Sequence, residues 1–181
     1  MNSRERIWAA IRHEEADRVP IDIGGTGVTG MNLIAYGNLK RHLGLTQGKA
    51  RVFHTWIQVP ELETAVAERL HTDTVTLPRY RMSLGIPIVE FKPWRFVVGT
   101  VYLVPAGFSP RRNEYGDFEW YEHGIKLAEA PGEGTHGFSL RHNPLRDATT
   151  AKEIDAWLDT YDGNFVGRIH VPDEELAWAR N

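Results

Sequence analysis

Residues 18–30, RVPIDIGGTGVTG, decide the fold class that the sequence predicts. The β-branched run at residues 19–23 is typical of a buried strand, and it turns directly into a glycine-dense loop. A helix is expected next, over residues 32–43, because apolar side chains recur on one face and Gly44 supplies a left-handed stop. Strand, glycine loop and helix in this order indicate an α/β protein.

The segments on either side extend this pattern. Asn2 and Glu5 form a capping box at the start of a helix expected to run to about His13, with Ile7, Trp8, Ala10 and Ile11 on its apolar face. Residues 61–70 carry the apolar stripe of another helix, and residues 73–77 alternate as a strand. The first eighty residues therefore predict the order α-β-α-α-β of a parallel sheet.

Residues 86–139 change to a period of two, which predicts an antiparallel insert with turns at residues 113–116 and 122–124. Its alternating aromatic residues are expected to form the insert's own core; they are Trp94, Phe96, Tyr102, Phe118, Trp120 and Tyr121. Helical patterns return with a capping box of Thr150 and Glu153, and again from Pro172.

Composition excludes several classes of function. The 181 residues carry a net charge of -3 and no cysteine, which fits one domain over residues 1–181 without thiolate chemistry or Cys-ligated zinc. Near-neutral charge gives no footprint for nucleic acid, and no apolar run is long enough to span a membrane. We therefore expect a cytoplasmic protein with neither nucleic acid nor membrane as partner.

The glycine loop is the candidate binding site. Residues 25–30 match G-x-G-x-x-G, but a dinucleotide site also needs an acid about 20 residues on, and residues 23–60 contain none. The same stretch holds Lys40, Arg41, Lys49 and Arg51, so it suits an anionic small-molecule substrate. The alternative is that the glycines only allow a tight turn and that the four cations are solvated. The candidate substrate-binding residues are Gly24, Gly25, Thr26, Gly27 and Asn32.

Asp22 is the candidate catalytic residue, because it lies at the carboxyl end of the first expected strand, where ligands of α/β proteins bind. Alternatively, it accepts hydrogen bonds from the amides of the following loop. Asp73 begins an expected strand at the opposite edge, so it is expected to have a structural role or to face solvent. The eight histidines show no metal-binding spacing, and His136 and His142 are the only close pair, so no metal site is predicted.

Four motifs resemble the uroporphyrinogen decarboxylase superfamily, which includes methylcobalamin:coenzyme M methyltransferases. They are SRER at residues 3–6, DRVPID at 17–22, LHTDTV at 70–75 and EYGD at 114–117. The resemblance implies a TIM barrel that acts in tetrapyrrole decarboxylation or corrinoid-linked methyl transfer. The chain departs from both branches, since residues 24–30 lack the paired arginines of the decarboxylases and no cysteine is present to hold the methyltransferases' zinc.

A complete barrel needs about 250 residues, so the expected fold is a partial, incomplete TIM barrel with an antiparallel β insert. The chain is then expected to be the N-terminal portion of a barrel protein and to be inactive alone. No cofactor is expected in this portion, whereas zinc and a corrinoid suit a complete methyltransferase. Two alternatives are a methyltransferase whose metal half lies on another chain and a non-catalytic α+β binding module. An unclosed sheet leaves Val19, Ile21, Val75 and Leu77 partly uncovered, so the expected partner is the missing barrel half or a second copy.

Overall fold

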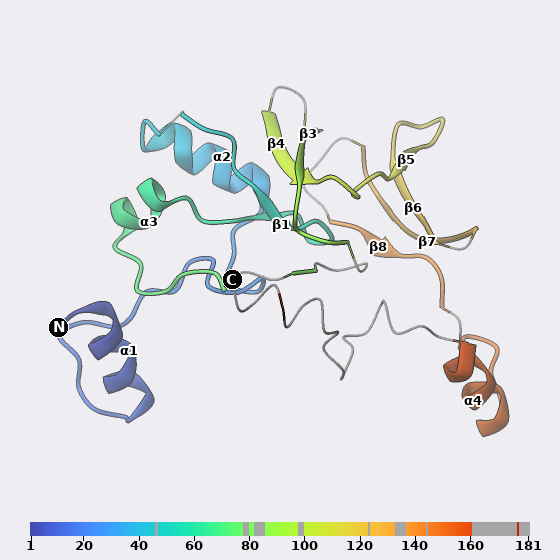
Figure 1. The fold of residues 1–181 in the computed structure, drawn as a ribbon, viewed down its shortest axis with the longest axis horizontal. Coiled ribbons are helices and arrows are strands. Elements are labelled where there is room, and N and C mark those ends of the chain that lie inside the picture. The colour runs from blue at the N-terminus through green and yellow to red at the C-terminus, as the bar shows by residue number, and fades with distance from the viewer. Residues whose placement is uncertain are drawn as a thin grey trace.

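The computed structural model describes residues 1–45, 47–77, 80–81, 86–97, 100–122, 124–132, 137–143, 145–160 and 177, with the backbone alone for residues 97, 100, 122 and 157–160. The helices are α1 (Ser3–Ile11), α2 (Leu33–His42), α3 (Thr64–Leu70) and α4 (Ala151–Thr160). The strands are β1 (Val52–His54), β2 (Val59–Pro60), β3 (Phe91–Val97), β4 (Thr100–Pro105), β5 (Arg111–Arg112), β6 (Phe118–Glu122), β7 (Ile125–Ala130) and β8 (Ser139–Leu140). Figure 1 places α1 and α4 at opposite ends of the molecule, with the strands between them.

The strands form small antiparallel sheets. β1 pairs with β2, β3 pairs with β4, and a separate sheet has the order β5-β6-β7-β8. A parallel bridge between Arg51 and Leu103, with Leu103 N donating to Ala50 O at 3.0 Å, joins the beginning of β1 to β4. The β1–β2 and β3–β4 hairpins thus form one layer, and Leu33 and Tyr36 of α2 pack against its buried side chains.

The prediction of a partial TIM barrel is wrong. Every named strand pair among the described residues is antiparallel, and residues 19–23 and 73–77 form no regular strand. These two segments lie side by side, since Asp73 N donates to Ile21 O at 2.8 Å, but Ile21 N donates to the Asp73 carboxylate instead of a backbone carbonyl. The Asp73 carboxylate therefore accepts the hydrogen bond that a backbone carbonyl would accept in the parallel strand pair that the β-branched runs predicted.

The helix predictions are largely confirmed. α1 begins with the predicted capping box of Asn2 and Glu5, and α4 follows the predicted Thr150 and Glu153 box. α3 begins at Thr64, three residues later than the apolar stripe suggested, because Glu63 is its extended N-cap. The helix expected from Pro172 lies outside the described residues.

The buried face of α1 differs from the predicted one. Arg6 and Ala9 are buried, whereas Trp8 and Ile11 are 46% and 61% exposed. Arg6 faces inward because its guanidinium contacts the carboxylates of Asp17 and Asp73 at 2.6 and 2.5 Å. Ion pairs thus orient this helix against the apolar pattern of its sequence.

The antiparallel insert is confirmed within the described residues. β6 and β7 pair across the expected turn, where Gly124 has φ +81°, and Gly116 N donates to Asn113 O at 3.0 Å in the other turn. His123, expected in the first of these turns, lies outside the described residues. The short β1–β2 pair was not predicted from the sequence, because strands of three and two residues are too short for a periodicity to show.

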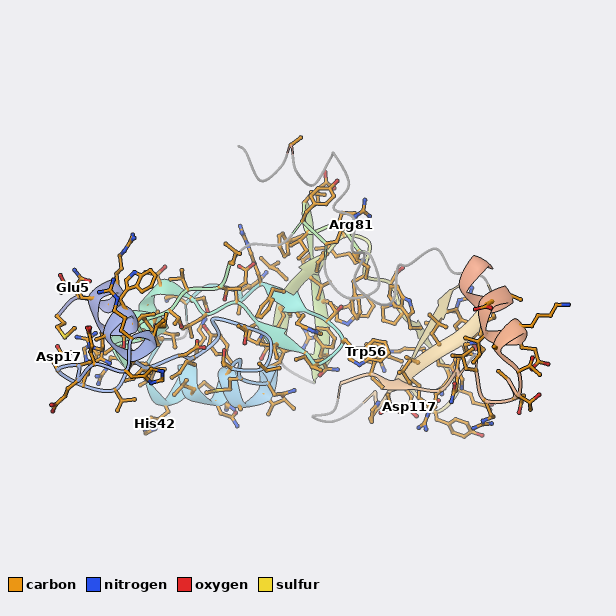
Figure 2. All side chains as sticks on the ribbon, turned by 90° about the horizontal axis from the view of Figure 1, so that it is seen from below. Glu5, Asp17, His42, Trp56, Arg81 and Asp117 are labelled. Carbon is orange, nitrogen blue, oxygen red and sulfur yellow. The ribbon has the colours of Figure 1, made fainter. Side chains whose placement is uncertain are left out.

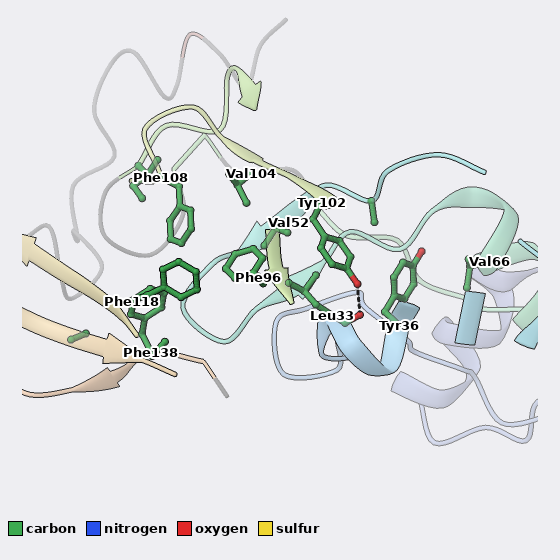
Figure 3. Packing of buried hydrophobic residues seen from close by; sticks show 14 residues of the cluster. Leu33, Tyr36, Val52, Val66, Phe96, Tyr102, Val104, Phe108, Phe118 and Phe138 are labelled. Atoms are coloured by element: carbon green, nitrogen blue, oxygen red, sulfur yellow. Dashed lines mark hydrogen bonds between the residues drawn. The ribbon is translucent and has the colours of Figure 1, made fainter. Parts of the chain in front are cut away.

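One apolar core runs through both regions of strands. Figure 3 shows Leu33 and Tyr36 of α2 beneath Tyr102 of β4, whose hydroxyl donates to Leu33 O at 2.7 Å, and Phe96 beside Phe108 and Phe118. Trp56 lies where the N-terminal elements meet the four-stranded sheet (Figure 2), and its ring contacts that of Phe138 at a centroid distance of 6.0 Å. Among the described residues, no helix combines the length and the apolar character needed to cross a membrane.

Candidate functional site

The glycine loop is held by hydrogen bonds within itself. Gly24 N donates to Thr29 O at 3.0 Å, and Gly25 N donates to Asp22 Oδ1 at 2.9 Å. Thr26 and Thr29 exchange bonds between their amides and hydroxyls at 3.0 and 3.3 Å. These four amides, which would have been the donors of an anion site, are already used inside the loop.

The backbone geometry explains why positions 24 and 27 carry glycine. Gly24 has φ +80°, a left-handed conformation that favours glycine. A Cβ at Gly27 would lie 3.0 Å from Cδ2 of His54, so glycine there allows the loop to approach β1. Both constraints concern the path of the loop.

The beginning of α2 also satisfies its own donors. The Asn32 side chain accepts from Ile34 N at 3.0 Å, and Leu33 N donates to Gln58 O at 3.0 Å. Farther along the helix, Lys40 pairs with Glu63 at 2.6 Å. Asn32 is therefore a helix cap, and this part of the expected anion site is internally paired.

Asp22 lies beside the second segment. Its Oδ1 accepts a hydrogen bond from Thr74 Oγ1 at 2.5 Å, in addition to the bond from Gly25 N. The Thr76 hydroxyl similarly donates to Gly24 O. The bond from Gly25 N is of the kind that the alternative interpretation of Asp22 expected, whereas the bond from Thr74, which joins the glycine loop to residues 74–76, was not predicted. The catalytic role of Asp22 stays a prediction.

Asp73 lies in an ion-pair cluster that connects α1 to these segments. Its side chain is fully buried and accepts from Arg6 at 2.5 Å and from Arg18 at 2.6 Å. Burial alone would raise its pKa, but hydrogen bonds from Ile21 N and from the two guanidiniums hold the pKa well below its usual range. The structural role expected for Asp73 is therefore supported by its contacts.

A pocket of about 450 Å³ is bordered by residues 74–77. It is lined by Arg51, Phe53, Glu61, Leu62, Thr64, Ala67, Thr74, Val75, Thr76, Leu77, Ile88 and Phe91. Small-molecule sites typically measure about 300–1,000 Å³ and combine apolar walls with a few polar groups. Val75 and Leu77 are 86% and 79% exposed, so the pocket is open along this side.

Arg51 and Glu61 are the charged residues among the described lining. The Arg51 guanidinium lies 4.9 Å from the centre of the Phe91 ring, a cation–π contact. Burial raises the pKa of the Glu61 carboxyl above its ordinary value, and the charge of Arg51 opposes this only in part. The pocket therefore offers a cation beside a carboxyl group that retains its proton more readily than an exposed one.

In the sequence, Arg51 stands out only as one of several cations, and Glu61 was not predicted as a site residue. The available signal was that Glu61 is the first acid after the long acid-free stretch that contains Arg51. What the sequence could not show is that the two residues line one cavity.

The histidines form no site in the described part of the chain. Nδ1 of His54 accepts from Ile57 N at 3.4 Å, and His136 and His170 lie outside the described residues, which leaves the His136–His142 pair undescribed. Among the residues that the structure describes, no group of three or more His, Cys, Asp or Glu could hold a metal ion.

Comparison with known proteins gives no match to a family model, to a curated protein or to a solved structure.

Proposed function

We propose that this chain binds a small organic acid with an apolar body in the pocket beside residues 74–77. The observation that carries the proposal is the position of Arg51, which lines an otherwise largely apolar cavity and whose guanidinium lies over the ring of Phe91, another lining residue. Arg51 forms no ion pair with a carboxylate among the described residues, so its planar fork of donors is available to a ligand's acid group. Phe53, Leu62 and Phe91 provide the apolar contact for the remainder of the ligand.

The resemblance to the uroporphyrinogen decarboxylase superfamily supports an acid as ligand. Carboxylated tetrapyrroles are the substrates of its decarboxylases, and the methyltransferase branch acts with a corrinoid. Within this proposal the chain supplies ligand binding, and Asp22 contributes through Thr74, the hydroxyl that connects it to the pocket. Decarboxylation and methyl transfer enter the proposal only as the reaction classes that the resemblance names.

Phenylacetate is a suitable probe because it joins one carboxylate to an apolar ring, and phenylacetamide is its neutral counterpart. We expect saturable binding of phenylacetate and much weaker binding of phenylacetamide by isothermal titration calorimetry. Arg51→Gln should weaken phenylacetate binding by roughly 10- to 100-fold, the equivalent of about 1.5–3 kcal/mol for a hydrogen bond to a charged group.

The matched control is Arg95→Gln, which removes an exposed arginine of β3 that does not line the pocket. It should leave binding unchanged, and circular dichroism verifies the fold of both variants. Equal binding of the acid and the amide, or equal loss in the two variants, would contradict the proposal.

A second candidate function is self-association. Val19, Val75 and Leu77 are 81%, 86% and 79% exposed along two adjacent segments. Ile21, the fourth apolar residue expected to stay partly uncovered, is half-buried, and no parallel sheet edge is present among the described residues. Burying the three exposed side chains against a second copy of the chain would remove this surface from water.

A further inference from the structure

The β1–β2 pair places Arg51 and Glu61 directly opposite each other. Val52 faces Pro60 in the antiparallel register, so the next pair outward is Arg51 with Glu61, and Glu61 N donates to Arg51 O at 2.7 Å. Residues opposite each other in an antiparallel pair project to the same face, with Cβ atoms about 4.5–5.5 Å apart. The register therefore brings a guanidinium and a carboxyl group to one wall of the pocket.

The two side chains nevertheless do not neutralise each other. Among the described residues, Arg51 and Glu61 form no ion pair with each other, and the Arg51 guanidinium lies over the Phe91 ring. Apolar side chains of Leu62 and Ile88 line the same cavity and reduce the hydration of the Glu61 carboxyl. This environment raises the pKa of the Glu61 carboxyl above its ordinary value, and the charge of Arg51 partly opposes the rise.

The neighbouring charged groups have other partners. Glu63 bonds to Lys40, and Asp22 accepts from Thr74 on the loop side. His54 is packed against Gly27, while Phe53 beside it lines the pocket. Among the described lining residues, Glu61 is thus the carboxyl group that an entering anion would meet.

Building on the proposed function, we infer that a bound carboxylate lies between the guanidinium of Arg51 and the protonated carboxyl of Glu61, so that the pocket takes apolar monocarboxylic acids together with a proton. The carboxylate oxygens accept from the Arg51 N–H groups and from the Glu61 O–H. Where Glu61 is ionised in the free protein, one proton from solvent is added to its carboxylate on binding, and no other bond changes.

The inference predicts a direction for the pH dependence. A ligand anion repels ionised Glu61, so the bound state holds the proton more tightly than the free state does. Phenylacetate affinity should be constant where the ligand is ionised and Glu61 is protonated in the free protein, and it should weaken by up to about tenfold per pH unit above the pKa of Glu61. A simple carboxylic acid is itself ionised from about pH 5 upward, so the ligand's own titration does not interfere between about pH 5 and 8.

The test is calorimetric titration of phenylacetate across this pH range, with Glu61→Gln as the variant and Glu68→Gln as the matched control. Glu68 is an exposed glutamate of α3 that does not line the pocket. Glu61→Gln keeps a donor without a titrating proton, so its affinity should be independent of pH and should exceed that of the unmodified protein at pH 8. Glu68→Gln should keep the pH dependence of the unmodified protein.

Proton uptake is also measurable in the unmodified chain, by comparing binding heats in two buffers of different ionisation enthalpy, so the inference does not depend on the folding of a variant. Binding with a flat pH profile and no proton uptake would overturn the inference and leave the proposed function standing. A Glu61→Gln variant that folds and retains the pH dependence would also overturn it. Absence of phenylacetate binding at every pH would overturn the proposed function together with the inference.

Discussion

Phe108 is the residue on which we expect the joining of the two strand regions to depend most. Its side chain is fully buried, and its ring lies 5.3 Å from that of Trp94, 5.6 Å from Phe96 and 5.8 Å from Trp120. Trp94 and Phe96 come from β3, whereas Trp120 comes from β6 of the other sheet. Removal of this ring leaves a cavity between the two sheets, because each sheet is held in place by its own strand pairs.

Phe108→Ala should lower the free energy of unfolding by about 3–5 kcal/mol, the usual cost of truncating a buried phenylalanine. A domain has about 5–15 kcal/mol in total, so this loss is a large fraction. At roughly 2–4 °C per kcal/mol for a chain of this size, the melting temperature should fall by about 6–20 °C. Urea unfolding followed by circular dichroism and tryptophan fluorescence measures the loss.

Two variants control for this effect. Phe108→Leu retains most of the buried volume and should recover much of the stability, whereas Tyr115→Ala changes a side chain that is 82% exposed and should cost less than about 0.5 kcal/mol. If Phe108→Ala is no more destabilised than Tyr115→Ala, the aromatic cluster does not join the sheets and the description of the core is wrong.

Two further predictions concern charge and exposed apolar surface. The pKa of Asp73 is held below its ordinary value of 3.8, so its ionised form stabilises the fold above about pH 4, and this contribution is lost as the pH falls further. The Asp73→Asn variant should therefore be less stable at pH 7 and should lose less stability between pH 7 and low pH. Urea titrations in which the variant and the unmodified protein lose the same stability at low pH would contradict this prediction. The exposed side chains of Val75 and Leu77 should cause self-association or binding of a hydrophobic dye, and the double variant Val75→Ser with Leu77→Ser should reduce both. A monodisperse monomer in analytical ultracentrifugation that also binds no dye would exclude this candidate function.

The candidate site has properties that could not be predicted from the sequence. The glycine loop was expected to offer free amides and cations, but Gly24, Gly25 and Thr26 donate within the loop and Lys40 pairs with Glu63. A sequence lists donors without showing which acceptor each one finds. The pocket instead depends on Arg51 and Glu61, ten residues apart, which become neighbours only through the register of a very short strand pair.

The sequence by itself determined the local elements: the capped beginnings of α1 and α4, and the alternating strands β3, β4, β6 and β7. These follow from hydrogen bonds and side-chain spacing within a few residues, so the local pattern contains the necessary information. Tertiary structure decided which segments pair. Residues 19–23 have the composition of a buried parallel strand, yet the Asp73 carboxylate takes the Ile21 amide and Val19 stays exposed. Partners distant in the chain compete for the same backbone groups, and the outcome of that competition depends on contacts that no local sequence pattern records.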